Sequence, residues 1–184
     1  MSLKKSSKPR IVAIIQARLT STRLPRKVLK KINGKTILQH TIDRVRQAKD
    51  LDNIVVASPE KIPFKNADFF IGDENDVLGR YYNCAIIEKA DIIIRITADC
   101  PLIDPEIIDY AIKYYKKHDF PYVYFAPVDG LDVEVFSFKM LEKTWLEATS
   151  FEDREHVTPF MKRFTKISID TQEDFEKVKN GMVK

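Results

Sequence analysis

The chain has 184 residues, of which 44% are hydrophobic and 32% charged, a composition typical of one globular domain. Its net charge of +4 comes from lysines spread among carboxylates, so no nucleic-acid partner is expected. No apolar run approaches the roughly 20 residues that span a bilayer, so no membrane partner is expected either.

Residues 1–9 carry charge but no apolar core, so we expect no secretory signal in them. We expect a disordered tail over 1–9 and a single domain over 10–184. The two cysteines, Cys84 and Cys100, have a spacing that fits neither a zinc cluster nor a redox pair. A reduced, cytoplasmic protein is therefore expected.

A strand is predicted over residues 11–15, where an unbroken aliphatic run is typical of a central strand covered on both faces. The polar loop after it cannot continue in the sheet, because Pro25 lacks the N–H that strand pairing needs. Its hydroxyls are those of Thr20, Ser21 and Thr22, and its cations are Arg18, Arg23, Arg26 and Lys27. Ligands of open α/β sheets bind at the C-terminal ends of strands, so we place the candidate site here.

The charge and composition of this loop favour a polyphosphate ligand. Backbone N–H groups in a turn form a concavity for anions, and Arg or Lys compensates the remaining charge. A nucleoside triphosphate is the expected ligand, and a solvated basic loop is the alternative that charge alone would favour. The P-loop pattern is absent, and no Gly-x-Gly-x-x-Gly follows the first strand, which excludes P-loop and Rossmann sites.

The next elements predict a parallel sheet. Asn33 and Gly34 indicate a turn before an amphipathic helix over residues 36–49, and a short buried strand follows over 54–57. Strand, helix and strand in this order imply a parallel crossover. A further strand is expected over residues 68–71.

A helix is predicted over residues 76–89, with Asn75 or Asp76 as its N-cap. Apolar residues recur in it at helical spacing, so its buried face is explained by packing alone. Arg80 lies within this helix, where it either contacts the nucleotide or forms a surface salt bridge.

The second informative stretch begins with a buried strand over residues 92–96 and leaves the sheet at Asp99. Pro101 blocks further pairing, and Asp104 followed by proline predicts the start of a helix over 105–117. Asp99 therefore stands at the C-terminal end of a strand. It is either a carboxylate that faces the ligand or a residue that caps its own turn.

Two more strands are predicted, over residues 121–125 and 131–136. Acidic and apolar residues alternate in the second, a pattern typical of a strand with one wet face, so Asp132 and Glu134 project the same way. They either border a bound substrate or belong to a solvated edge strand. A helix over 139–148 follows.

The end of the chain predicts a strand over residues 165–170 and a helix capped by Thr171. The strand ends at Asp170, which is therefore a second aspartate at the end of a strand. If the two strands are parallel, the carboxylates of Asp99 and Asp170 leave the sheet on the same side.

Several of these stretches resemble a known family. Ala13-Ile-Ile-Gln-Ala-Arg18 with Ser21-Thr-Arg-Leu-Pro-Arg-Lys27 is similar to the opening signature of cytidylyltransferase-type sugar nucleotidyltransferases, a group that includes CMP-acylneuraminate synthetases. The closest resemblance is to the spore coat polysaccharide biosynthesis protein F family. Further matching stretches follow in family order over residues 10–178, and they are Val-Leu-x-Arg80-Tyr-Tyr, Arg95-x-Thr-x-Asp99, Asp-Gly-x-Asp-Val-Glu134, Arg154-Glu-His156 and the closing Asp170-Thr-x-x-Asp-Phe-Glu.

The resemblance implies roles for named residues. Nucleotide contacts are implied for Ala13, Gln16, Ala17, Arg18, Ser21, Arg23, Lys27, Arg80 and Arg95. Catalytic roles are implied for Arg18, Lys27 and Asp99. Asp99 and Asp170 would hold Mg²⁺ (or Mn²⁺), and the acceptor would contact Asp132, Glu134, Arg154 and His156. Arg26 has no role because family members often have glycine there, and Ser168 stands where some have another aspartate.

The resemblance also implies a fold, which is a three-layer α/β/α domain with a mostly parallel central sheet, of the nucleotide-diphospho-sugar transferase (GT-A-like) type. The implied activity is transfer of a nucleotidyl group from CTP, or another NTP, to a sugar or sugar acid for surface or spore coat polysaccharide biosynthesis, with release of pyrophosphate. Two alternatives stay open: a glycosyltransferase of the same fold that uses a nucleotide sugar, and a non-catalytic nucleotide-binding partner subunit. Family members run longer after Arg154-Glu-His156, in a region often used for dimer contacts, so a homodimer and a complete acceptor site also stay open.

Overall fold

The computed structural model describes residues 8–118, 120–126 and 130–164. The tail predicted over residues 1–9 falls mostly outside this range. The predicted last strand and its helix, with Asp170 and Ser168, lie outside the described residues altogether.

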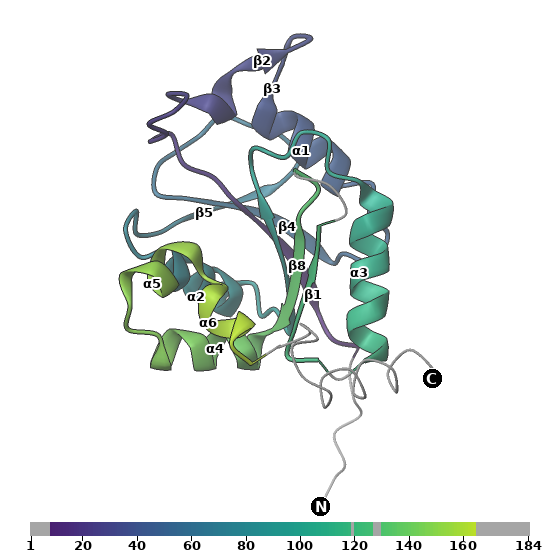
Figure 1. Ribbon diagram of the computed structural model, residues 1–184. Helices are drawn as coiled ribbons and strands as arrows, with labels where there is room; N and C mark the ends of the chain where they lie inside the picture. Colours follow the sequence, from purple (N-terminus) through teal and green to yellow (C-terminus); the bar gives the residue numbers. More distant parts are fainter. Residues whose placement is uncertain (1–7, 119, 127–129, 165–184) are drawn as a thin grey trace, which may run out of the picture.

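The core of the molecule is a six-stranded sheet (Figure 1). Its strands are β1 (Ile11–Gln16), β4 (Asn53–Ser58), β5 (Asp68–Ile71), β6 (Ile92–Thr97), β7 (Tyr122–Phe125) and β8 (Val133–Ser137). Their order across the sheet is β5-β4-β1-β6-β8-β7. The first four of these run parallel, and β8 is antiparallel to both of its neighbours.

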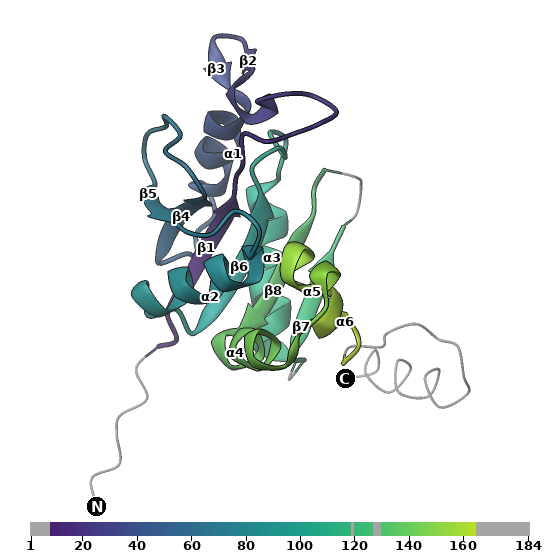
Figure 2. The same cartoon turned by 90° about the vertical axis from the view of Figure 1, so that its left-hand side faces the viewer.

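Helices cover both faces of this sheet. They are α1 (Ile37–Val45), α2 (Val77–Ile87), α3 (Pro105–Lys117), α4 (Phe138–Glu147), α5 (Phe151–His156) and α6 (Pro159–Lys162). Helices α1 and α3 lie on one face, and α2, α4, α5 and α6 lie on the other, as Figures 1 and 2 show. The predicted three-layer fold with a mostly parallel sheet is therefore confirmed.

Strand β1 lies in the middle of the sheet because both of its faces are apolar. Ile11, Ala13 and Ile15 pack into the layer of α1 and α3, and Val12 and Ile14 pack into the layer of α2 and α4. All five side chains are fully buried. Ala13 is among them, so its predicted nucleotide contact stays a prediction that the open surface of the site does not support.

The local signals for helix ends and turns are largely confirmed. The Asp76 side chain accepts a hydrogen bond from the Gly79 N–H at 2.9 Å, and that of Asp104 accepts one from the Glu106 N–H at 2.9 Å. Asn33 and Gly34 both have positive φ and join β2 (Lys31–Ile32) to β3 (Lys35–Thr36), as a two-residue hairpin requires. Helix α1, predicted to reach residue 49, ends at Val45.

The predicted wet face of the strand around Glu134 is wrong. Strand β8 lies between β6 and β7 and is not an edge strand, and the side chains of Val133 to Phe136 are all buried. The acidic position at Glu134 does not face water. Its charge is tolerated because it is paired inside the protein.

The parallel arrangement brings chemistry-bearing loops to one edge. The loops after β1, β4, β5 and β6 leave the sheet at its C-terminal edge, and β8 begins at the same edge because it runs antiparallel to β6. Within the described part of the chain, no helix has both the length and the apolarity needed to cross a bilayer.

Gly72, which follows β5, is required by close packing. A Cβ atom at this position would lie 2.7 Å from Cγ of the buried Arg80 and 3.0 Å from the Phe70 ring. We expect Gly72→Ala to lower the free energy of unfolding by about 1–3 kcal/mol, because neither neighbour has room to move. Urea unfolding measures the change, and in Gly72→Ala/Arg80→Ala the two effects should not add. Wild-type stability in Gly72→Ala would contradict the packing argument.

Candidate active site

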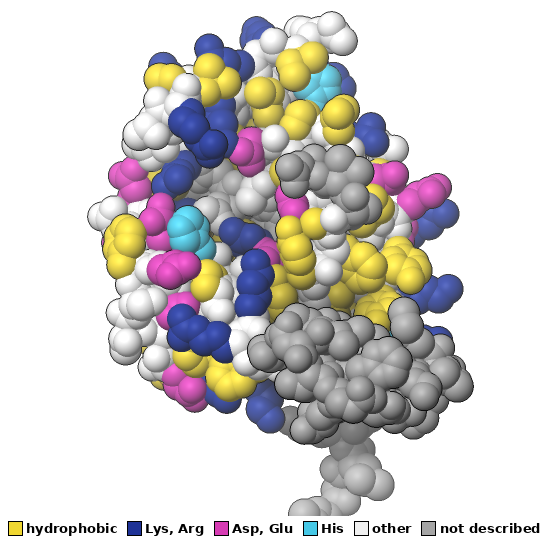
Figure 3. All heavy atoms as spheres, in the orientation of Figure 1, with side chains coloured by type: hydrophobic (Ala, Val, Ile, Leu, Met, Phe, Trp, Pro, Cys, Tyr) yellow, Lys and Arg dark blue, Asp and Glu magenta, His cyan; other side chains and the backbone are white. Residues whose placement is uncertain are grey.

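A polar hollow lies at the C-terminal edge of the sheet. The loop after β1, here called the basic loop (residues 17–27), borders it on one side and α5 on the other. Figure 3 shows this hollow with Lys and Arg side chains around it and Asp and Glu side chains among them. The position agrees with the site predicted from the sequence.

The backbone of the basic loop offers open donors. Of the seven N–H groups from Arg18 to Leu24, only that of Ser21 bonds a described residue, the Leu19 carbonyl, at 3.1 Å. The Arg26 N–H bonds the same carbonyl at 3.2 Å and closes the loop on itself. Free N–H groups beside cationic side chains are what an anion-binding concavity requires.

Ser21, which is half-buried, and Arg23, which is exposed, both lie on the basic loop, and Arg23 makes no ion pair with a described residue. Arg26 has a φ of 52°, in the left-handed region that glycine adopts without steric cost. This backbone angle supplies a physical reason for the glycine that similar proteins often have at this position.

Lys27 and Asp99 form an ion pair across the hollow. Each side chain is about one third exposed, at 31% and 35%. Asp99 is positioned through Ala98, whose N–H bonds the Gln16 carbonyl at 2.9 Å and whose own carbonyl accepts the Thr41 hydroxyl at 3.1 Å. Burial opposes the charge of Asp99, but hydrogen bonds from Lys27 and Thr97 outweigh it and hold the pKa of the carboxyl below its usual value.

Further contacts tie the basic loop to the elements opposite. Arg18 Nη1 lies 3.4 Å from Glu155 Oε1 of α5, and the Thr20 hydroxyl bonds Glu74 Oε1 at 2.9 Å. Both contacts are exposed, so each contributes little to stability and can be exchanged for a ligand. Arg18 is therefore available to an anion that enters the hollow.

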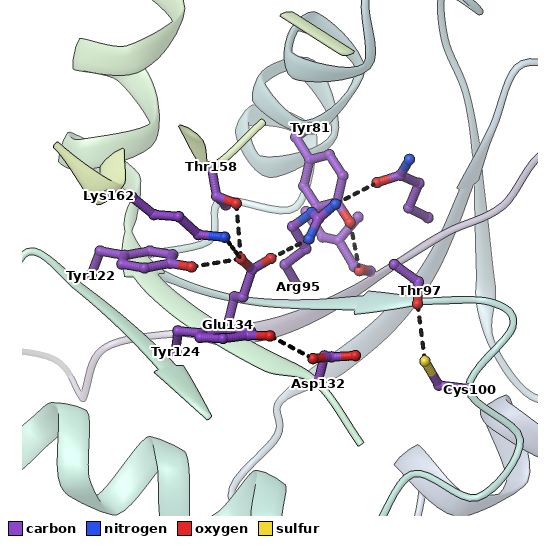
Figure 4. Close-up of polar contacts among 12 residues, drawn as sticks. Tyr81, Arg95, Thr97, Cys100, Tyr122, Tyr124, Asp132, Glu134, Thr158 and Lys162 are labelled. Carbon is purple, nitrogen blue, oxygen red and sulfur yellow. Dashed lines mark hydrogen bonds and ion pairs between the residues drawn. The ribbon is translucent and has the colours of Figure 1, made fainter. Parts of the chain in front are cut away.

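Glu134 is the centre of a buried polar network on this side of the sheet (Figure 4). Its carboxylate is paired with Arg95 of β6 and accepts hydrogen bonds from the Tyr122 hydroxyl at 2.5 Å and the Thr158 hydroxyl at 2.8 Å. Lys162 of α6 lies 3.6 Å away. Glu134 is only 3% exposed, so it acts on the site through these partners and does not offer a free carboxylate.

The charges in this network are mutually stabilised. Burial opposes charge on Glu134, yet Arg95, Tyr122 and Thr158 outweigh it and keep the pKa of the carboxyl below its ordinary value. Burial likewise opposes charge on Arg95, and Glu134 outweighs it and raises the pKa of the guanidinium. Burial and the neighbouring Glu134 raise the pKa of Tyr122, which therefore stays a neutral donor.

Gln16 and Ala17 lie where β1 ends and the basic loop begins. Gln16 Oε1 accepts a hydrogen bond from Arg95 Nη2 at 3.3 Å, which links it to the Glu134 network. Ala17 is buried, and its N–H bonds the Ala57 carbonyl at 3.0 Å. Gln16 is thus the residue of this pair whose side chain can reach a ligand.

Arg80 does not occupy either position predicted for it. Its side chain is 1% exposed, so it is neither a surface salt bridge nor an open ligand contact. Nη1 donates to the Asp73 carbonyl, and Nε and Nη2 are buried without a described partner. Burial lowers the pKa of this guanidinium. Arg80 supports the acidic loop (residues 72–76) from beneath.

The acceptor-side candidates are spread around the hollow. Asp132 accepts a hydrogen bond from the Tyr124 hydroxyl at 2.7 Å, and His156 is exposed at the end of α5. Arg154 is already paired with Asp76 and donates to the Trp145 carbonyl at 3.0 Å, so it holds α5 against the start of α2. The structure therefore leaves Asp132 and His156 as accessible members of this set.

Val157 turns the chain after α5. Its φ of 70° is rare for a β-branched residue, and its side chain is fully buried. The turn places the next residue, Thr158, on Glu134. Backbone strain of this kind persists only where the surrounding contacts enforce it.

The donors at this edge of the sheet fit Mg²⁺ only in part. No group of three or more His, Cys, Asp or Glu among the described residues could hold a metal ion. Asp99 is the carboxylate that fits, because Mg²⁺ takes one or two carboxylates and fills its octahedron with waters and substrate phosphates. The predicted partner Asp170 lies outside the described residues, so the pairing of the two aspartates stays a prediction.

Sequence reasoning missed several residues of this site. Tyr122 and Lys162 belong to no motif, and Glu155 stands inside the Arg154-Glu-His156 motif but was given no role; each reaches the site from an element distant in sequence. One signal was available, since a Glu in an otherwise apolar strand requires a buried counter-charge. The sequence does not say which cation supplies it.

A parallel sheet whose first strand feeds a basic loop with open N–H groups, facing an aspartate just after the neighbouring strand, is the framework of a nucleotidyltransferase. The sequence comparison specifies which kind: the family described as Cytidylyltransferase matches residues 12–184, and the chain belongs to this family. The predicted resemblance is thereby confirmed.

Three relatives illustrate the similarity. An uncharacterized protein of Methanocaldococcus jannaschii, MJ1063, is 41% identical over 83% of this chain and 67% of its own length. Spore coat polysaccharide biosynthesis protein SpsF of Bacillus subtilis is 32% identical over 92% of this chain and 85% of its own. The solved structure of a cytidylyltransferase from Leptospira borgpetersenii superposes with a TM-score of 0.76 and 28% identity, covering 94% of this chain and 86% of that one.

The Glu134 network predicts that removing the charge of this carboxylate lowers the free energy of unfolding by an amount that depends on pH. At pH 7, Glu134→Gln should lower the free energy of unfolding by about 3–5 kcal/mol, because it leaves Arg95 buried without its counter-charge. The pKa of Glu134 is depressed on folding, so its contribution is complete above about pH 4.3 and is lost as pH falls through the lower, folded value. Denaturant unfolding measures the difference in free energy of unfolding between Glu134→Gln and wild type. This difference should be smaller below pH 4 than at pH 7. A difference that is constant over this range would contradict the charged state of Glu134.

Proposed function

We propose that this enzyme transfers a cytidylyl group from CTP to a sugar or sugar acid and releases pyrophosphate. The observation that carries the proposal is the basic loop, whose open N–H groups and cations lie beside Asp99 at the end of the neighbouring strand. Family membership supports CTP as the donor. The polysaccharide function in the name of the Bacillus subtilis relative supports a sugar acceptor.

The chemistry requires little beyond positioning and charge compensation. An acceptor hydroxyl oxygen forms a bond to the α-phosphorus and loses its proton to water, the bond from the α-phosphorus to the bridging oxygen breaks, and pyrophosphate carries the electron pair away. The loop N–H groups and Arg18 would hold the phosphate oxygens in line for this displacement. The half-buried Asp132 and the exposed His156 would contact the acceptor on the opposite side of the hollow.

Lys27 and Asp99 form an ion pair without substrate, and binding of the triphosphate and Mg²⁺ would break this ion pair. The triphosphate carries more negative charge than one carboxylate does, so the Lys27 ammonium would pair with the phosphates instead of Asp99. The Asp99 carboxylate would then be free to bind Mg²⁺. Mg²⁺ would supply further neutralisation of charge on the phosphate oxygens. The free, buried thiols of Cys84 and Cys100 fit the cytoplasmic setting expected from the sequence.

The direct test combines the protein with each of the four NTPs, Mg²⁺ and a panel of sugar acids and sugar phosphates. Release of pyrophosphate should require CTP and an acceptor, and Asp99→Asn should abolish it with the fold intact by circular dichroism. Nucleoside diphosphate released from a nucleotide sugar would instead identify a glycosyltransferase. CTP binding without turnover on any acceptor would identify a non-catalytic subunit.

The basic loop predicts selective loss of triphosphate binding. Arg18→Ala and Lys27→Ala should each weaken CTP by about ten- to a hundredfold, because a charge-assisted contact contributes roughly 1.5–3 kcal/mol. Cytidine affinity should change much less. Isothermal titration with both ligands measures the contrast, and Lys113→Ala, on α3, is a matched control. Unchanged CTP affinity in both loop variants would remove the loop from the site.

A further inference from the structure

Gln16 is the last residue of β1, and its backbone is already committed to the sheet. Its carbonyl accepts the Ala98 N–H at 2.9 Å, and the residue is in register with Ala57 on one side and Thr97 on the other. Only the side-chain amide is left to interact beyond the strand. That amide stands at the point where the basic loop departs from the sheet.

The orientation of this amide is fixed by chemistry. Arg95 Nη2 lies 3.3 Å from Gln16 Oε1, and a guanidinium can only donate hydrogen bonds. The amide atom that faces Arg95 must therefore be the oxygen, and the NH₂ group must face away. A rotated amide would set two donors against each other.

Arg95 cannot turn away to relax this constraint. Its guanidinium is held by the ion pair with Glu134, which Tyr122 and Thr158 hold in turn (Figure 4). The network reaches back through three strands and the turn after α5. Gln16 thus presents a donor of fixed polarity at the edge of the sheet.

The amide NH₂ is open to a ligand. Gln16 Nε2 has no hydrogen-bond partner among the described residues. Arg95 Nε and two nitrogens of Arg80 also lack a described partner, but those atoms are buried. Gln16, in contrast, is partly exposed. A ligand atom that meets Nε2 must be a hydrogen-bond acceptor.

The local charge indicates which part of the nucleotide this acceptor belongs to. Next to Gln16, the buried guanidinium of Arg95 is engaged by Glu134 and by Gln16 itself, so it is not free to bind a phosphate. The loop cations, including Arg18 and Lys27, lie beyond it along the chain. An uncharged acceptor, such as a ring nitrogen or carbonyl of a nucleobase, is the matching group.

We propose that Gln16 determines base specificity, with its amide NH₂ locked outward by the Arg95–Glu134 pair to donate to an acceptor atom on the pairing edge of cytosine. The inference rests on the proposed function. Cytosine offers N3 and O2 as adjacent acceptors, whereas uracil places an N–H donor at N3. A fixed donor that meets N3 therefore favours CTP over UTP, since two donors facing each other leave both unpaired.

The decisive variant is Gln16→Glu, which reverses the polarity. One carboxylate oxygen would replace Oε1 against Arg95, and the other would present an acceptor where the NH₂ stood. The ratio of UTP to CTP dissociation constants, measured by isothermal titration without acceptor, should fall about tenfold or more. Gln16→Leu, which removes the donor, should weaken CTP more than UTP. Gln47→Glu, the same change at an exposed position just after the end of α1, should leave the ratio unchanged.

The outcomes separate this inference from the proposed function. If wild type binds no NTP, both fail. If wild type binds CTP and turns over an acceptor, but the ratio in Gln16→Glu and Gln16→Leu stays within about twofold of wild type, only the base-reading role of Gln16 is overturned. A raised KM for the acceptor with an unchanged ratio would assign Gln16 to the sugar and overturn the inference as well.

Discussion

A carboxylate placed between a sheet and its covering helices must be neutralised and hydrogen-bonded, because the cost of removing it from water is otherwise several kcal/mol. Glu134 imposes this requirement here. Its partners come from β6, from β7, from the turn after α5 and from α6. The same contacts that satisfy one charge therefore set β8 between its two neighbours and attach the last described helices to the sheet.

The Glu134 network also organises charge in the hollow. Because Arg95 is engaged by Glu134 inside the protein, the cations that a ligand can reach include those of the basic loop. A nucleotide is itself divided in this way, with a neutral base and an anionic triphosphate.

The rim of the hollow is built from weaker contacts than its base. Arg18 with Glu155, Thr20 with Glu74, and Lys27 with Asp99 join the basic loop to the elements opposite it. These pairs are at least partly exposed and are easily exchanged for a more highly charged ligand. A rigid interior with an exchangeable rim suits an enzyme that must admit and release a polyphosphate.

The sequence by itself determined the elements and the place of the site. Continuous apolar runs produced β1 and β6, Asp76 and Asp104 capped their helices as predicted, and the cations of residues 18–27 emerged at the C-terminal edge of the sheet. These features depend on neighbours along the chain, which is why local pattern was sufficient. The family resemblance added the class of enzyme, and the comparison confirmed it.

Only the tertiary structure decided which polar groups meet. The alternation around Glu134 suggested a wet strand, but the sheet order sets β8 beside β6 and closes Arg95 onto Glu134. Arg80 is buried under the acidic loop, which no helical pattern could have revealed. Such pairings join residues tens of positions apart in sequence. Their energies depend on burial and distance, and both are fixed only when the strands have found their order.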